Sequence, residues 1–343
     1  MSPQPDLPPE PPPPDPLMNL LFGTVDGPLL KLPILRAGIE LQVWAEIASG
    51  HQTASDVAAV IGADLHGMRS LLDALTVMKL LEKDGMEYRL PDWAEYYLLP
   101  GKPTYLGHFV LEWLAWEGHG KLAQAIRTGK HPIIPDVTHA EAVGHFLPFY
   151  AVRAQSPHHY IQRYADYWQK LRVEAREGLQ VLDLACGVAI AAHALALQHP
   201  GVRVTLQDWP AMLEFALQAA SKLGVDRQML ILPGDMLSVD IPIGKFDIVR
   251  LGYVTYFFGD EDLVKLFRRT RAALKSGGIL VIEVSLSDEE RKENQAAILD
   301  GPWLYAISAR GDTYTFLDYK KLLEKSGFKN VTKVDDELVK AER

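Results

Sequence analysis

In the first third of the chain, apolar residues recur at intervals of three and four positions, which is the period of amphipathic helices. Such segments cover positions 28–44, a stretch from Thr53 to Gly62, and positions 64–80. Thr53 is a good helix-capping residue, and glycine commonly ends a helix. Two short runs then flank Asp84-Gly85, a pair that favours a tight β-turn. Three helices followed by a hairpin predict a winged-helix domain.

From Gly178 onward, short apolar runs alternate with longer amphipathic ones, which predicts a mostly parallel sheet with helices on both faces. The predicted strands cover 180–184, 202–206, 229–232, 246–251 and 279–283. Helices are predicted after Ala189, Pro210, Leu237 and Asp260, and over 317–326. Two final runs, 329–334 and 337–341, predict an antiparallel hairpin that closes the sheet. The fold class is therefore α/β, with a Rossmann-like sheet behind an N-terminal, mainly helical domain.

These patterns divide the chain into four regions. Residues 1–20 are rich in proline with acidic spacers, a composition that favours an extended, disordered tail. The predicted winged-helix domain follows over 21–103. A helical linker rich in aromatic and histidine residues occupies 104–168, and we expect it to form one wall of a cleft. The sheet domain occupies 169–343.

Composition narrows the class of protein. The 343 residues are 48% hydrophobic and 23% charged, and no apolar run approaches the length of about eighteen residues that a membrane span needs. The chain start lacks the basic and apolar regions of a signal peptide, so we expect a cytoplasmic protein with no membrane association. A single cysteine, Cys186, excludes an internal disulfide framework. The scattered histidines lack a metal-ligand spacing, so no metal is expected.

The net charge of −9 bears on the winged-helix domain, because this fold often binds DNA. Its third helix carries Arg69 and Lys79 but also Asp64 and Asp73, and the hairpin is acidic. Such a face cannot neutralise several phosphates, so nucleic acid is not expected as a partner. A DNA-binding regulator that senses a small molecule is therefore the weaker hypothesis, and a scaffold or dimerisation module is favoured.

The first strand of the sheet domain ends in a turn of small residues, Asp183-Leu184-Ala185-Cys186-Gly187-Val188-Ala189. Small side chains are needed wherever the backbone approaches a ligand closely. A pyrophosphate-binding loop uses three glycines, and only Gly187 is present here. The turn is therefore poorly shaped for a dinucleotide and better suited to a ligand without phosphate.

Acidic residues follow the next two predicted strands. Asp208 stands where a carboxylate can accept hydrogen bonds from both hydroxyls of a ribose. Asp235 can accept the exocyclic amine of adenine while Met236 covers the ring. Each carboxylate alone could be a helix cap or a surface charge, but the ends of adjacent parallel strands meet in one crevice. The three positions together predict a nucleoside site.

These residues resemble the class I S-adenosylmethionine-dependent methyltransferases, and specifically the small-molecule O-methyltransferase family with a winged-helix dimerisation domain. The resemblance covers 28–343. The family's first motif, Asp-x-Gly-x-Gly-x-Gly, is similar to 183–189, its Asp-Leu-Pro to Asp208-Trp209-Pro210, and its Gly-Asp-Met/Phe to Gly234-Asp235-Met236. The run 268–278 is similar to the family's helix and turn before strand five.

The resemblance implies a cofactor, S-adenosylmethionine, with S-adenosylhomocysteine as its product. The cofactor-binding residues that it implies are Asp183, Ala185, Gly187, Asp208, Trp209, Asp235, Met236 and Gly252. Within this set, Ala185 and Gly187 would line the methionine part, and Asp208 would bind the ribose. Family members are usually homodimers through the winged-helix region, which implies a homodimer here.

At the catalytic position the chain departs from the family. The family carries Leu-His-Asp-Trp after strand four, and its histidine removes the proton of the acceptor hydroxyl. Counted from Asp247 without gaps, Tyr256 stands at the histidine position, and Gly252 stands where the family has a cofactor-contacting lysine. Because a free tyrosine has a pKa near 10, Tyr256 either positions the acceptor or needs a nearby cation to act as a base. A bacteriochlorophyllide C-methyltransferase, which methylates a tetrapyrrole ring carbon, resembles this chain in having tyrosine here.

We therefore predict methyl transfer to a planar, largely apolar small molecule, at a phenolic or enolic hydroxyl or at an activated ring carbon. Such a transfer depends mainly on aligning acceptor, methyl and sulfur, and base catalysis adds to it. The predicted acceptor-binding residues are Phe146, Phe149, Tyr150, Arg153, Trp303 and Tyr305. The alternative is a protein of the same fold that binds the cofactor without methylating, as an isomerase, a cyclase or a binding-only paralogue.

Overall fold

The computed structural model describes residues 28–102, 105–107, 110–111, 120–130, 138–155, 157–173, 177–308 and 310–343. The predicted proline-rich tail lies outside these residues. The chain divides into two compact units, one that ends at Lys102 and one that begins at Pro103. Among the helices of the described part, none is long and apolar enough to cross a bilayer.

The N-terminal unit is made of short helices and one hairpin. Its described helices are α2 (Pro28–Glu40), α3 (Val43–Ala48), α4 (Ala54–Ile61), α5 (Leu65–Val77) and α6 (Asp92–Tyr97). Strands β1 (Glu82–Asp84) and β2 (Glu87–Arg89) pair antiparallel. The first helical region is split into α2 and α3 because Gln42 adopts a left-handed φ of 54°. Trp44 is fully buried, and its indole N–H donates to the Leu80 carbonyl at 3.0 Å.

The two boundary residues read from the sequence, Thr53 and Gly62, start and end α4 as predicted. The Thr53 side chain accepts a hydrogen bond from the Asp56 N–H, which starts α4, and Gly62 ends α4 with a φ of 73°. The Asp64 carboxylate accepts from the Gly67 N–H at 2.7 Å and starts α5. These contacts satisfy backbone groups that have no partner inside the helix.

The C-terminal unit contains the sheet and the helices around it. Its described helices are α8 (Leu122–Thr128), α9 (Val143–Gln155), α10 (His158–Lys170), α11 (Ile190–Gln198), α12 (Pro210–Leu223), α13 (Asp260–Ala273), α14 (Gln295–Ile307) and α15 (Phe316–Lys325). Short 3-10 turns are η2 (Ala140–Ala142), η3 (Asp226–Gln228) and η4 (Thr255–Phe257). The strands are β3 (Gln180–Leu184), β4 (Arg203–Asp208), β5 (Met229–Pro233), β6 (Phe246–Gly252), β7 (Leu274–Glu283), β8 (Lys329–Asp335) and β9 (Leu338–Glu342).

These seven strands of the described residues form one sheet in the order β5-β4-β3-β6-β7-β9-β8. Strands β3, β4, β5, β6 and β7 run parallel to one another. Strand β9 pairs antiparallel with both β7 and β8. The predicted α/β sheet and its closing hairpin are thus confirmed. The helix predicted after Leu237 is wrong, because the segment forms a turn in which the Asp235 carboxylate accepts from the Leu237 N–H at 2.8 Å. Strand β7 also begins earlier than predicted, at Leu274 rather than at position 279.

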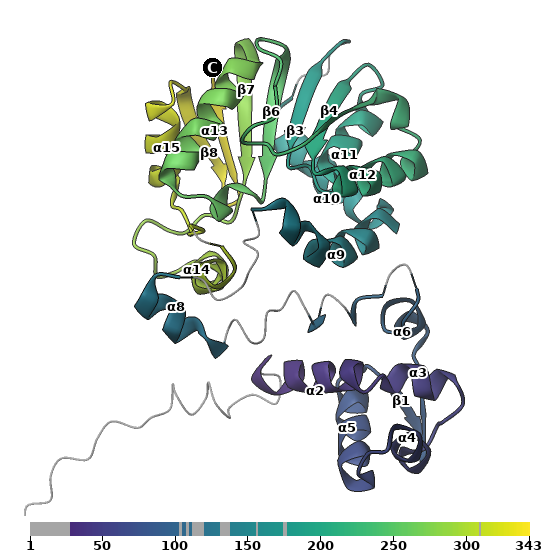
Figure 1. The fold of residues 1–343 in the computed structure, drawn as a ribbon. Coiled ribbons are helices and arrows are strands. Elements are labelled where there is room, and N and C mark those ends of the chain that lie inside the picture. The colour runs from purple at the N-terminus through teal and green to yellow at the C-terminus, as the bar shows by residue number, and fades with distance from the viewer. Residues whose placement is uncertain are drawn as a thin grey trace, which may run out of the picture. The chain divides into compact units, whose positions relative to one another are not determined.

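Helices cover both faces of the sheet (Figure 1). On one face, Leu182 and Val249 pack against residues such as Phe267 in α13, and on the other face Val181 and Ile248 share a core with α10, α11 and α12. Side chains alternate between the faces along each strand. Because Asp183 and Arg250 are register partners, both point to the face that α10 covers.

Candidate functional site

The turn after β3 is the centre of the candidate site. Ala185, Gly187 and Ala189 all adopt left-handed backbone conformations, with φ of 50°, 55° and 58°. Left-handed backbone is easy for glycine and costs about 1–2 kcal/mol for other residues. Ala185 and Ala189 therefore adopt a backbone conformation that favours glycine, and the turn keeps this conformation although it has alanine at both positions.

Asp208 at the end of β4 holds this turn. Its carboxylate accepts from the Gly187 N–H at 2.8 Å and from the Trp209 N–H at 2.7 Å. The neighbouring Gln207 side chain accepts from the Ala185 N–H at 3.2 Å and donates to the Gly234 carbonyl. Burial raises the pKa of Asp208 to about 6, although the two N–H donors oppose that rise. Hydrogen bonds from Gln207 and Asp208 thus connect the turn after β3 to the carboxyl ends of β4 and β5.

The third predicted contact, Asp235-Met236, follows β5. Met236 is buried in the core beside the sheet. The Asp235 carboxylate accepts from the Leu237 N–H and, at 3.2 Å, from the Ser238 hydroxyl. These hydrogen bonds stabilise the turn that follows β5. Each carboxylate oxygen has two lone pairs, which leaves Asp235 able to accept a further donor.

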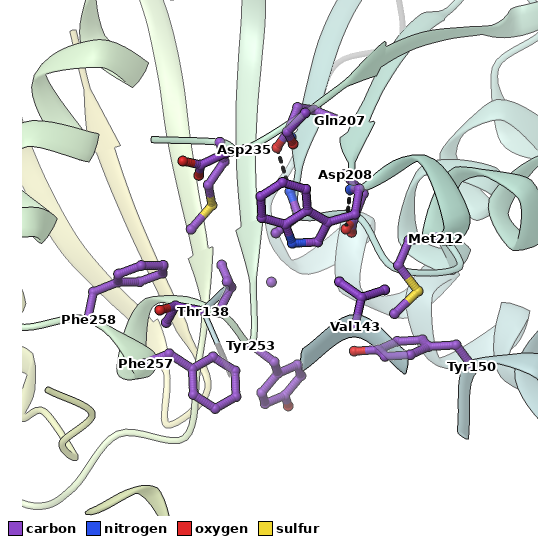
Figure 2. A pocket seen from close by; sticks show the side chains of 16 residues that line it. Thr138, Val143, Tyr150, Gln207, Asp208, Met212, Asp235, Tyr253, Phe257 and Phe258 are labelled. Atoms are coloured by element: carbon purple, nitrogen blue, oxygen red, sulfur yellow. Dashed lines mark hydrogen bonds between the residues drawn. The ribbon is translucent and has the colours of Figure 1, made fainter. Parts of the chain in front are cut away.

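A pocket opens where these strand ends meet. Its lining residues are Thr138, Val143, Tyr150, Ala185, Gln207, Asp208, Trp209, Met212, Gly234, Asp235, Met236, Gly252, Tyr253, Val254, Phe257 and Phe258. Figure 2 shows Asp208 and Asp235 at the sheet edge, with Tyr253, Phe257 and Tyr150 opposite them. One wall is therefore polar and anionic, and the other is aromatic. We call this space the first pocket.

A second pocket lies on the other side of the same turn. It is lined by Tyr150, Arg153, Tyr160, Arg163, Tyr164, residues 185–191, Arg250, Gly252 and Tyr253. The two pockets share Tyr150, Ala185, Gly252 and Tyr253, so they meet above the turn. We call the two adjoining pockets together the crevice; its first pocket carries the acidic residues and its second pocket carries the arginines.

The structure separates the residues predicted to bind the acceptor. Tyr150 lines both pockets, whereas Arg153 lies in the second pocket, with its guanidinium 5.5 Å from the centre of the Tyr160 ring. Trp303 and Tyr305 lie half-buried on α14 and line neither pocket. The Phe146 and Phe149 side chains lie outside the described part of the structure.

Tyr256 sits in η4, directly after β6. Its ring packs edge-on against Phe257, with 4.6 Å between the ring centres, and contacts the core between the sheet and α13. Burial raises the pKa of the Tyr256 phenol well above its ordinary value, and the negative charge of Asp300 on α14 adds to that rise. This rise makes the phenol a weaker base, and Tyr256 lines neither pocket. Both the base role and the positioning role of Tyr256 stay predictions.

Sequence reasoning missed several residues of the site. Met212, Thr138, Val143 and the pair Phe257-Phe258 line the first pocket, and only the pair had a signal, an apolar run next to the catalytic position. Arg250 in the second pocket was also missed, and it had a clear signal. A charged residue inside an otherwise apolar, buried strand requires buried partners.

No metal centre emerges from the described residues, where no group of three or more His, Cys, Asp or Glu side chains could hold an ion. Cys186 is buried, and burial raises the pKa of its thiol.

Comparison with known proteins adds an independent line of evidence. A model of the O-methyltransferase domain matches residues 120–329, and a model of the O-methyltransferase dimerisation domain matches residues 29–100. The tetracenomycin polyketide synthesis 8-O-methyl transferase TcmO of Streptomyces glaucescens is 24% identical, over 87% of this chain and 87% of its own.

Solved structures show the same fold. PigF with SAH, a protein known from Serratia, has a TM-score of 0.76 at 19% identity, covering 96% of this chain and 99% of its own. Human N-acetylserotonin methyltransferase in complex with SAM has a TM-score of 0.67 at 22% identity, covering 96% and 97%.

Proposed function

This chain belongs to the O-methyltransferase family, and from that premise we propose that it transfers the methyl group of S-adenosylmethionine to a small-molecule acceptor. The family model covers more than half of the chain. The resemblance read from the sequence motifs is thereby confirmed, and the chain is a methyltransferase.

The chemistry of the residues that line the crevice suits the cofactor. Asp208 offers carboxylate oxygens to the ribose hydroxyls, Asp235 offers an acceptor to the adenine amine, and Met236 and Trp209 supply apolar surface. The turn at 185–189 brings backbone close to the methionine part without a phosphate-binding glycine cluster. When bound, the cofactor supplies a methyl group activated by a sulfonium leaving group. The protein's own contribution is to orient the acceptor toward it and to exclude water.

The aromatic wall of the first pocket supports a planar, largely apolar acceptor. Tyr253, Phe257, Phe258 and Tyr150 present ring faces and edges there, and such surfaces bind flat ligands through stacking and burial (Figure 2). Burial raises the pKa of the Tyr256 phenol, which makes it a poor base and favours an acceptor that loses its proton readily. We therefore propose an acceptor that ionises easily, a phenol or an enol, or one with an electron-rich ring carbon.

The observation that carries this proposal is the contact between Asp208 and the turn at Gly187, because it places a carboxylate beside a backbone shaped for close approach. The test is calorimetry with S-adenosylhomocysteine on the wild type, on Asp208→Ala, and on Asp336→Ala as a control. Asp336 is an exposed aspartate outside both pockets. We expect binding by the wild type and the control, with affinity reduced at least about tenfold in Asp208→Ala. Absence of binding by the wild type would overturn the proposal.

Tyr256 lines neither pocket, which favours the alternative, a family member that binds the cofactor without methylating. Mass spectrometry of the product separates the two. A methyltransferase adds one methylene to the acceptor and releases S-adenosylhomocysteine, whereas an isomerase or cyclase releases none.

The dimerisation domain over residues 29–100 supports a homodimer formed through the N-terminal unit. Sedimentation velocity over a range of concentrations checks this. A species of monomer mass at every concentration would contradict it.

A further inference from the structure

A buried ion network lies under the second pocket. Arg250 donates to the Asp183 carboxylate at 2.8 Å and also to the Glu283 carboxylate. All three side chains are almost fully buried, with exposures of 6%, 0% and 2%. One oxygen of Asp183 and the Nε of Arg250 are buried without a hydrogen-bond partner. Three neighbouring strands, β3, β6 and β7, are joined by this network at their carboxyl ends.

The Arg250 guanidinium occupies the space where residue 252 would carry its side chain. A Cβ added at Gly252 would lie 2.2 Å from Nη2 of Arg250, 2.5 Å from Cζ and 2.6 Å from Nη1. Any other residue at position 252 would therefore have to displace the guanidinium.

The guanidinium is not free to move aside. Carboxylates hold it on two sides, and the rings of Tyr164 and Tyr167 lie 5.7 Å from it, measured from Cζ to each ring centre. A buried arginine that leaves such partners exposes uncompensated charges inside the protein. The Arg250 side chain therefore cannot easily make room for a Cβ at position 252, although arginine side chains are flexible.

The network also reaches the walls of the crevice. Asp183 is two residues before Ala185, the first left-handed residue of the turn. The carbonyl of Glu283 accepts from the Tyr253 N–H at 2.7 Å, and Tyr253 itself has a left-handed φ of 50°. Gly252 and Tyr253 line both pockets, and Arg250 lines the second. One guanidinium therefore contacts both Asp183, which leads into the turn, and Glu283, whose backbone carbonyl accepts from the Tyr253 N–H.

We propose that Arg250 is a positioning residue for the methionine end of the cofactor site, and that Gly252 is required because the Arg250 guanidinium fills its side-chain space. This inference rests on the proposed function of the crevice. It assigns Arg250 no contact with the reacting atoms. Arg250 acts by fixing the positions of the turn at 185–189 and of Tyr253.

The experiment is a double-mutant cycle on positions 250 and 252, with the affinity for S-adenosylhomocysteine and the KM for S-adenosylmethionine as readouts. The variants are Gly252→Ala, Arg250→Ala and the double variant. Gly120→Ala is the matched control, because a Cβ at Gly120 meets no atom within 4 Å. Melting temperature and gel filtration establish that each variant is folded.

We expect Gly252→Ala to weaken the affinity for S-adenosylhomocysteine about tenfold when Arg250 is present. In the Arg250→Ala background the loss should be less than about twofold, because the Cβ no longer meets a guanidinium. KM for the cofactor should rise more than kcat falls. If the two losses are independent and simply multiply, or if Gly252→Ala binds like the Gly120→Ala control, the proposal is overturned.

A second arm serves if Arg250→Ala does not fold. Glu283→Gln loosens one side of the guanidinium, so it should reduce the effect of Gly252→Ala, and an unchanged effect would count against the proposal. Failure of the proposed function has a different signature, namely no binding by the wild type. Normal binding in the wild type, loss in Asp208→Ala and no coupling between positions 250 and 252 would refute this inference alone.

Discussion

Acidification should weaken cofactor binding through a single carboxylate, that of Asp208. In the free protein, burial raises the pKa of Asp208 to about 6 from an ordinary value of 3.8. Ribose hydroxyls donate hydrogen bonds to the ionised form, so binding favours loss of the proton and lowers that pKa again. Affinity is therefore full above pH 7 and falls as the pH drops through 6.

The size of the effect follows from the titration. With a pKa of about 6, the ionised fraction is about nine-tenths at pH 7 and about one-tenth at pH 5. The dissociation constant should thus rise about tenfold between these values, which equals about 1.4 kcal/mol of binding free energy. Above pH 7 the profile should be flat.

Calorimetry with S-adenosylhomocysteine at pH 5, 6, 7 and 8 measures this profile. Near pH 6, titrations in two buffers of different ionisation enthalpy should show release of about half a proton. Asp208→Asn is the control, since it keeps the shape and removes the titrating group, and its weaker affinity should not depend on pH. A wild-type affinity that is constant from pH 5 to 8, or an equal slope in Asp208→Asn, would refute the reasoning.

Three further predictions concern stability and turnover. Buried His193 has no hydrogen-bond partner and a pKa lowered to about 4 from 6.5, so stability should fall by about 3 kcal/mol as the pH drops from 6.5 toward 4. His193→Leu should remove that loss in urea unfolding. If the free energies of unfolding of the wild type and His193→Leu differ by the same amount at pH 6.5 and at pH 4, the prediction is contradicted. Ala189→Gly should relieve the left-handed backbone and raise the free energy of unfolding by about 0.5–1 kcal/mol, and a loss of stability would show that the alanine is not strained. Tyr256→Phe should lower kcat with any accepted phenol and leave the affinity for S-adenosylhomocysteine unchanged, whereas full turnover would end the positioning role of Tyr256.

The pattern of residues was enough to predict the architecture and to group several residues that line the first pocket. Strands of a parallel sheet are short apolar runs, and their carboxyl ends converge by topology, so residues that follow them can be grouped from the sequence. Asp208, the small-residue turn and Met236 were found in this way. The chain also carried its own helix caps at Thr53 and Gly62, because capping depends on local contacts.

Only the tertiary structure decided the rest, because it depends on residues far apart in the sequence. Asp183, Arg250 and Glu283 meet because three strands lie side by side, and nothing local to any of them fixes that ion network or the need for glycine at position 252. The pKa of Tyr256 was likewise undetermined by its neighbours in sequence, since it is set by how deeply the folded chain buries the phenol and by Asp300 on another helix. Burial and long-range charge are properties of the packed molecule, whereas periodicity and capping are properties of the chain.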